Sequence, residues 1–382
     1  MKKNIKIRQD IRKGNHRVKR KVAKYNPIKR HRYINHLGYT IERIVFPESF
    51  DIYNTKLGLE NTLQVLELIE TISKKFHKNN SLILQLDMSR CEQIKGAASV
   101  MLFAAVEQAI KKFGVQFEIK KPIEFEPKGV IENSGLIELC RDSKAYYDFE
   151  QSYLPIISGY GGEYRDEIVD FIMHRIYENN LTPEMENIYS DAIQEAINNV
   201  GAHAYLPDEE SKPWWVKCSL IKDQLFLVIY DTGMGIPVSF QSGNKLYDQI
   251  DFNSEQTIES VKETFVGDII KMYSTFDIYL EALKKHAADG ISNEFLDAHI
   301  IALAMHENIT RRTGKDEYKH GQGSKSIKAL VSENDEGLLW IFSNSGLMKF
   351  KQTSQLPELT NLTLPIKGTL LQWNIQVNQN GN

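Results

Sequence analysis

Three polar residues recur at helical spacing within one segment of the chain. Glu195, Asn199 and His203 are four residues apart, so on an α-helix they form a single polar stripe. The other side of that helix is apolar and carries Ile193, Ala196, Ile197 and Val200. Such a stripe is most often a solvated helix face. A carboxylate and an amide in line could instead bind the metal ion of a nucleotide and position a water molecule beside it. The motifs that follow in the sequence discriminate between these two interpretations.

The segment after this helix favours a ligand site. Residues 225–230 form a continuous apolar run, as in a covered β-strand, and the run delivers Asp231 to a strand end beside Gly233 and Gly235. Glycines there permit a tight turn and close approach of the backbone to a flat ligand. A buried carboxylate at that point could accept a hydrogen bond from an exocyclic amine such as that of adenine. Taken alone, this short motif would more simply be a turn.

Two later segments extend the pattern. Gly321 and Gly323 open a helix of apolar periodicity, and glycines at a helix N-terminus expose backbone amides to a phosphate chain. Gly368 and Thr369 then start a final strand and offer a hydroxyl to the base or to Asp231. In this order the segments indicate a nucleotide pocket.

Helices and strands around these residues must hold them in place. A helical pattern begins at Asp166, and Pro183 is a suitable first residue for a long helix that runs to about Tyr205. Residues 146–163 are rich in Tyr, Gly and Pro, so we expect a linker or a lead-in strand there.

The four segments, in this order, resemble the GHKL ATPases, which include gyrase, the heat-shock chaperone ATPase, histidine kinases and the MutL mismatch-repair proteins. The resemblance is nearest to the anti-sigma-factor serine kinases, whose first box has the form E-A-x-x-N-x-x-x-H, as Glu195 to His203 do here. It covers about Tyr164 to Val377. It implies a Bergerat-type α/β sandwich over residues 164–382 that binds ATP with Mg²⁺.

The resemblance also assigns roles to individual residues. Glu195 would be the general base, Asn199 the Mg²⁺ ligand, and His203 would lie near the phosphates. Asp231 would read the adenine N6 amine. The pocket, its lid and the support of the adenine end would come from Gly233, Gly235, Gly321, Gly323 and Thr369.

Two features depart from the family pattern. The glycine box that starts at Gly321 reads Gly-Gln-Gly-Ser-Lys rather than a Gly-Leu-Gly-Leu form, which leaves the phosphate contacts of the lid open. Residues 238–319 form a long helical lid insertion where compact members have a short lid, and its pattern predicts helices over 258–285 and 293–312. The insertion could gate the pocket or serve as a platform for a partner.

The preceding part of the chain predicts a small α/β domain over residues 38–145. Strands and helices alternate there in a β-α-β-α-β order, which is typical of an α/β layer domain. The expected elements are a strand at 39–45, a helix at 57–76, a strand at 81–86, a helix at 96–113 and a strand at 115–119.

Two segments of this domain are similar to STAS domains, the fold of anti-sigma-factor antagonists. Residues 86–98 resemble the central segment of that family, and residues 131–139 resemble the turn of its last helix. The family carries a phosphorylatable Ser or Thr in the loop before the long helix. Gly96 and Ala97 stand there in this chain, so we expect a docking or dimerising module rather than a phosphate switch.

The composition is that of an ordinary globular protein. A chain of 382 residues with 42% hydrophobic and 25% charged residues predicts two domains. The longest nearly apolar run, 97–106, is far shorter than the roughly 20 residues that cross a bilayer, and the basic N-terminus has no apolar leader, so no membrane association is expected. Cys91, Cys140 and Cys218 are widely separated, which favours a reducing compartment, the cytoplasm.

Charge is distributed unevenly along the chain. Residues 1–32 hold 14 Lys and Arg residues against one acid, whereas the rest holds 33 basic and 49 acidic residues. We therefore expect residues 1–37 to be a basic arm, disordered or extended. The arm could bind nucleic acid through residues 1–32 by counterion release, or dock on its own acidic body or an acidic partner. No aromatic interleaving or recognition helix accompanies it.

Three functions remain open on these observations. The first is an ATPase whose hydrolysis acts as a conformational switch, controlling a protein partner or a second copy of the chain through the STAS-like domain and the lid. The second is a Ser/Thr protein kinase of the anti-sigma type. The third is a non-hydrolysing ATP sensor that binds nucleic acid through its arm. The retained Glu195 argues against the third, because a sensor needs no base.

Overall fold

The chain folds as a mixed α/β protein, as the sequence predicts. The computed structural model describes residues 25, 27, 31–76, 82–206, 208–241, 254–265, 275–289, 297–305, 323–334, 336–351, 353 and 357–377. The predicted arm, apart from its last residues, lies outside these ranges. None of the described helices combines the length and apolarity that crossing a bilayer requires.

The first half of the chain, for which the sequence predicts a STAS-like domain, is built on a four-stranded sheet in the order β1-β2-β4-β6. Strands β2, β4 and β6 are parallel, and β1 is antiparallel to β2. The strands are β1 (His31–Ile34), β2 (Thr40–Val45), β4 (Leu82–Asp87) and β6 (Gln116–Lys120). Two long helices, α2 (Leu57–Phe76) and α3 (Gly96–Phe113), make the crossovers, and their apolar sides bury against Leu82, Leu84 and Leu86 of β4. Apart from β1, for which no strand was expected, these elements match the expected ones to within two residues at each end.

Smaller elements complete this half. A short parallel pair joins β3 (Ser49–Phe50) to β5 (Gln93–Ile94). Helices α4 (Phe125–Glu132) and α5 (Leu136–Asp142) follow β6. Strand β1 lies inside the residues expected to form the arm. It pairs with β2, and Arg43 lies over the Tyr33 ring at 5.8 Å, a contact that helps to hold this edge strand in place.

The second half is built on a five-stranded antiparallel sheet in the order β10-β11-β9-β8-β7. The strands are β7 (Ile157–Tyr160), β8 (Pro213–Ile221), β9 (Gln224–Asp231), β10 (Leu338–Lys351) and β11 (Glu358–Gln376). The segment expected as a linker or lead-in strand thus contributes the edge strand β7. The final strand begins at Glu358 rather than at Gly368, because β10 and β11 form a long hairpin that extends beyond β9.

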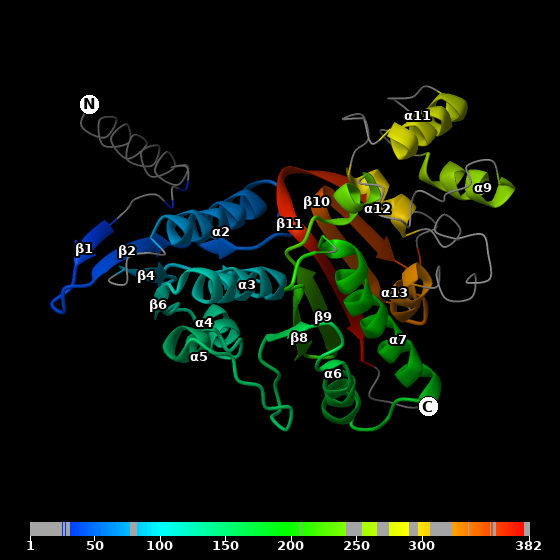
Figure 1. Cartoon of the computed structure of the whole chain (residues 1–382). Coiled ribbons are helices and arrows are strands. Elements are labelled where there is room, and N and C mark those ends of the chain that lie inside the picture. The colour runs from blue at the N-terminus through cyan, green and yellow to red at the C-terminus, as the bar shows by residue number, and fades with distance from the viewer. Residues whose placement is uncertain are drawn as a thin grey trace, which may run out of the picture.

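One face of this sheet is covered by helices of the second half. They are α6 (Arg165–Phe171) with the π-helix η1 (Ile172–Ile176), α7 (Pro183–Asn199) with the π-helix η2 (Val200–Ala204), and α13 (Gly323–Ser332). The Thr182 side chain caps α7 by accepting from the Met185 amide, and Pro183 is its first residue, as predicted. Leu225, Leu227 and Ile229 of β9 face these helices. Figure 1 shows α7 lying in front of the sheet with α13 beside it.

The other face of the same sheet is covered by the first half of the chain. Trp215, Tyr230 and Phe342 point to this side and belong to one continuous core with α2 and α3. Figure 1 shows α2 and α3 running from the first sheet toward β8, β9 and β11. Because strand residues alternate between faces, each of β9 and β11 carries one row toward α7 and one row toward α3.

The insertion is helical where it is described. It contains α8 (Ile236–Gln241), α9 (Glu255–Thr264), α11 (Phe276–Asp289) and α12 (Asp297–Ala304), and α9, α11 and α12 share a small apolar core. The helical pattern expected over 258–285 is interrupted, since α9 ends at Thr264, Phe265 is not helical, and α11 begins at Phe276. The helix expected over 293–312 is described only as α12. Residues 306–322, which include Gly321, lie outside the described residues.

Candidate functional site

The polar stripe lies on α7 and on the π-helix that continues it. Glu195 and Asn199 are half-buried on α7, and His203 is half-buried on η2. The side opposite the stripe is buried against the sheet, as its apolar pattern predicts. The change from α to π geometry at Val200 was not predicted. It widens the helix at the end that carries His203, and such π segments are frequent at functional sites.

Asp231 ends β9 on the face that α7 covers. Asp231 is only 4% exposed, and its Oδ1 atom accepts a hydrogen bond of 2.8 Å from the Gly233 amide. The Thr369 amide also donates to this carboxyl. Burial raises the pKa of Asp231 to about 7, although the two amide donors favour the ionised form. At the position expected to contact adenine, the structure therefore holds a carboxyl group whose pKa lies near neutral pH.

The turn after β9 lies directly on the end of η2. The Met234 amide donates to the Ala204 carbonyl over 2.6 Å, one residue after His203. A Cβ atom on Gly233 would lie 2.0 Å from that same carbonyl oxygen, so only glycine fits this approach. The structure thus brings the Asp231 turn and the His203 end of the stripe together, as the order of the motifs predicts.

Gly368 makes a second close approach at Asp231. Its φ is +75°, and a Cβ atom there would lie 2.1 Å from the Asp231 carbonyl oxygen. Glycine is required both by the left-handed backbone and by this contact. Its neighbour Thr369 shares the face of β11 that points to α7, since Leu371 and Trp373 of the same row pack there. Thr369 is therefore on the same side of the sheet as Asp231.

Ser343 and Asn344 of β10 belong to this site but were not predicted from the sequence. Ser343 Oγ accepts from the Ile236 amide over 2.8 Å and lies 3.0 Å from Thr369 Oγ1. Asn344 Nδ2 donates to the Met234 carbonyl over 3.1 Å. The signal that could have found these residues is the pair of polar side chains that interrupts the apolar run 338–342.

Asn344 also carries an unsatisfied group. Its Oδ1 atom is buried and has no hydrogen-bond partner among the described residues. A Cβ atom on Gly235, whose φ is +82°, would lie 2.1 Å from this oxygen. Gly235 therefore lets the backbone approach β10 closely, whereas the sequence predicts close approach to a flat ligand. The contact leaves a polar acceptor at the site without a donor among the described residues.

Thr232 links the site to the first half of the molecule. Its amide donates to the Tyr205 hydroxyl over 3.1 Å, and that hydroxyl donates to the Pro213 carbonyl over 2.7 Å. On the other side of the sheet, Gln108 Nε2 of α3 donates to Thr232 Oγ1 over 2.7 Å. These contacts connect η2, β9 and α3 through one residue that adjoins Asp231.

The structure brings most of the predicted site residues to one place. Asp231, Gly233, Gly235 and Thr369 cluster where β9 ends beside the middle of β11, and His203 directly precedes Ala204, whose carbonyl contacts this turn. Asn199 lies one turn before His203, and Glu195 lies one further turn back along α7. Gly323 is the first residue of α13, which packs against α7.

The polar atoms at this end of β9 can be compared with those that the expected nucleotide and magnesium ion would need. Asp231 offers a buried acceptor to an amine, and the unpaired Asn344 oxygen lies at the same turn. No group of three or more His, Cys, Asp or Glu side chains placed to hold a metal was found within the described ranges. Mg²⁺ does not need such a group, because it is commonly bound by one or two protein oxygens together with substrate phosphates and waters. The amide of Asn199 is a suitable single ligand.

Comparison of the chain with models of known protein families found no match, and comparison with curated proteins also found none.

Proposed function

We propose that the chain is a Mg²⁺-dependent ATP-binding protein of the GHKL type that hydrolyses ATP as a conformational switch. The observation that carries this proposal is the arrangement at the end of β9. There a buried carboxylate, Asp231, is held by the amides of Gly233 and Thr369 and lies beside the helix end that carries His203. This combination suits an adenine amine on one side and a phosphate chain toward the helix.

Each residue of the site has a task in this proposal. Asp231 accepts a hydrogen bond from the adenine amine, and Glu195 orients and deprotonates the attacking water. Asn199 holds Mg²⁺, which when bound would neutralise charge that develops on the phosphates. Transfer of a phosphoryl group to water depends mainly on positioning and charge stabilisation, which this set of side chains can supply.

The link to a partner rests on the two-sided sheet. Thr232 follows Asp231 and is bonded to Gln108 of α3, so a change at the nucleotide reaches the STAS-like half over a short path. A protein kinase of the anti-sigma type would use the same pocket. Phosphorylation by the chain itself at the start of α3 is disfavoured, because α3 starts at Gly96 and the nearby Ser99 is buried, with its hydroxyl bonded to the Gly96 carbonyl at 2.6 Å.

A single-turnover experiment with γ-labelled ATP tests the proposal. The full chain is mixed with substoichiometric ATP and Mg²⁺, and bound ATP, free phosphate and phosphoprotein are separated over time, with and without nucleic acid. We expect ATP to bind and free phosphate to appear. Label on the protein would indicate a protein kinase instead of an ATP hydrolase. Bound ATP that persists unchanged would indicate a sensor, and absence of ATP binding would overturn the proposal.

A further inference from the structure

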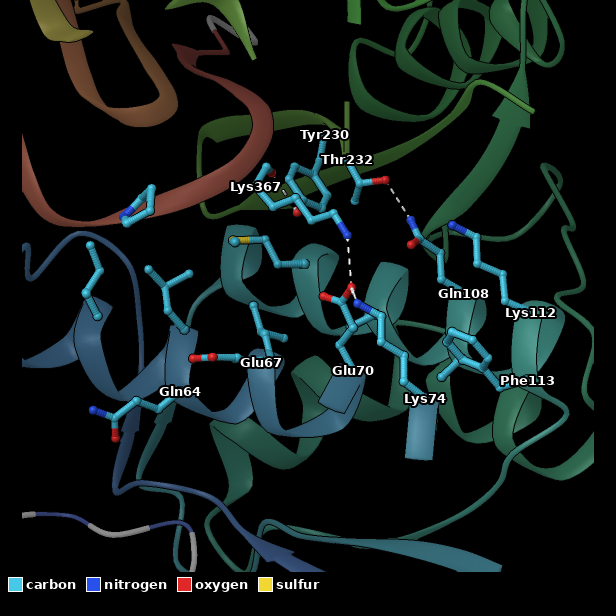
Figure 2. A pocket seen from close by; sticks show the side chains of 17 residues that line it. Gln64, Glu67, Glu70, Lys74, Gln108, Lys112, Phe113, Tyr230, Thr232 and Lys367 are labelled. Atoms are coloured by element: carbon cyan, nitrogen blue, oxygen red, sulfur yellow. Dashed lines mark hydrogen bonds and ion pairs between the residues drawn. The ribbon is translucent and has the colours of Figure 1, made fainter. Parts of the chain in front are cut away.

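A cavity of about 400 Å³ lies between the STAS-like half and the five-stranded sheet. Its walls come from α2 and α3 on one side and from β9 and residues 364–367 of β11 on the other, as Figure 2 shows. Tyr230 and Thr232 reach into it from the strand that ends near Asp231, but on the opposite face. The volume is within the range of small-molecule sites in proteins. The candidate nucleotide site does not use this space.

The inner part of the cavity is apolar. Leu66 of α2 and Met101 and Ala105 of α3 line it from the STAS-like half, and the Tyr230 ring faces them from the sheet. The Tyr230 hydroxyl is already engaged, because it donates to the Lys367 carbonyl over 3.0 Å. A ligand in this part would therefore meet hydrocarbon and aromatic surface, which favours an apolar body.

The rim carries a surplus of positive charge. Three lysines line the cavity against two glutamates, and one of these, Glu67, is exposed to solvent. The other, Glu70, is paired with Lys74 at 2.7 Å and with Lys367 at 3.3 Å. Burial alone would raise the pKa of Glu70, but the two lysines outweigh it and lower the pKa. The single Glu70 carboxylate thus forms ion pairs with the ammonium groups of both Lys74 and Lys367.

The third lysine, Lys112, has no such partner. In the part of the chain that the structure describes, no ion pair involves its ammonium group. Lys112 lies one helical turn after Gln108, and Figure 2 shows the two side chains next to each other on α3 with Phe113 nearby. A ligand that reaches this edge meets an unpaired cation beside an aromatic ring.

We propose that this cavity binds a small amphipathic anion, a molecule with an apolar body and one carboxylate or phosphate group. The apolar body lies between Leu66, Met101 and Tyr230, and the anionic group lies at the rim with Lys112. A neutral amphiphile leaves the excess charge of the rim unpaired. A fully polar anion leaves the apolar wall in contact with water.

Calorimetric titration of the full chain without nucleotide tests this assignment. Decanoate represents an acyl source of the ligand, 2-naphthoate an aromatic one, and decyl phosphate the phosphate form. Decanol and decylamine are the neutral and cationic controls. We expect at least one of the three anions to bind ten-fold or more tightly than both controls. Equal binding of decanol, or no measurable binding of any anion, overturns the proposal.

Two substitutions locate the binding. Lys112→Glu reverses the charge of an exposed residue and should lower the affinity for the anion at least ten-fold. Lys75→Glu, on the exposed surface of α2 and outside the cavity, should leave this affinity unchanged. Equal losses in both variants would mean that only general surface charge is at work. Ala105→Met fills the inner part and should abolish binding in a protein whose melting temperature is retained. Unchanged affinity in this variant would also overturn the proposal. Because no ATP is present, these outcomes are independent of the proposed function.

Discussion

Gln108 and Thr232 join the two halves of the molecule at the candidate site. Gln108 Nε2 donates to Thr232 Oγ1 over 2.7 Å, across a separation of 124 residues in the chain. Thr232 directly follows Asp231, and its amide donates to the Tyr205 hydroxyl just beyond η2. A displacement of α3 therefore acts on both backbone segments that surround the Asp231 carboxylate.

Substitution of Gln108 by Leu should weaken nucleotide binding from a distance. The change keeps the size of the side chain but removes its bond to Thr232, which contributes about 1 kcal/mol to stability. Under the proposed function, we expect the dissociation constant of a non-hydrolysable ATP analogue to shift several-fold, measured by equilibrium binding. Gln116→Leu, at an exposed position on β6, is the matched control. If both variants bind the analogue as the wild type does, the contact is structural only.

Substitution of Gly233 by Ala should destabilise the fold and the site together. The added Cβ would lie 2.0 Å from the Ala204 carbonyl oxygen, a backbone atom that cannot move aside without displacing η2. We expect a loss of about 3 kcal/mol in the free energy of unfolding, measured by denaturant titration. Gly201→Ala is the control on η2 itself, because a Cβ there meets nothing within 4 Å. A similar stability of the two variants would contradict the close approach.

Asp231 should make stability depend on pH. Its pKa is about 7 in the folded chain, against an ordinary value of 3.8. Between these two values the folded state keeps a proton that the unfolded state releases, so stability is highest below the lower pKa and falls as the pH rises. The slope is about 1.4 kcal/mol per pH unit, and it vanishes above the upper pKa.

The pH effect can be isolated with Asp231→Asn. The amide does not titrate, so the free energy of unfolding of the variant minus that of the wild type should increase between roughly pH 4 and pH 7 and then stay constant. The measurement is denaturant unfolding at a series of pH values. A difference that is the same at every pH would show that burial does not raise the pKa of this carboxyl.

Glu195→Gln separates turnover from binding. Under the proposed function the amide cannot take a proton from water, so phosphate release should fall by about 100-fold or more. The affinity for ATP should stay within about three-fold of the wild-type value, since the proposed function assigns Glu195 no contact with adenine. Phosphate release and equilibrium binding are measured on the same preparation. Glu186→Gln, an exposed position in the first turn of α7, is the control. Wild-type turnover in Glu195→Gln would remove the residue from its role.

Long amphipathic helices and continuous apolar strands were predictable from the sequence. The periodicity of α2 and α3 and the apolar run of β9 depend on neighbours a few residues away, so local pattern was sufficient. Asp231 and its glycines could be expected together for the same reason, because one strand end and its turn hold them.

Features that depend on distant segments were not predictable. Ser343 and Asn344 lie in β10, and their hydrogen bonds to the turn around Gly235 span 107 and 110 residues of the sequence. For the segment of the edge strand β7 the sequence left a linker and a lead-in strand open, because this strand is short and is stabilised by pairing with β8 rather than by its own pattern. The continuous core between α3 and the sheet likewise joins residues more than a hundred positions apart, as the bond between Gln108 and Thr232 does.

The continuous core on the far face of the sheet also constrains how this chain can change over generations. Trp215, Tyr230 and Phe342 of the five-stranded sheet are covered by α2 and α3 of the first half, so side chains of both halves form this interface. A larger side chain on α3 must be matched by a smaller one on β8 or β9, because interiors are close-packed. The two halves are therefore expected to be inherited as one unit, and exchanging either of them for a homologous module should fail unless the facing residues are exchanged as well.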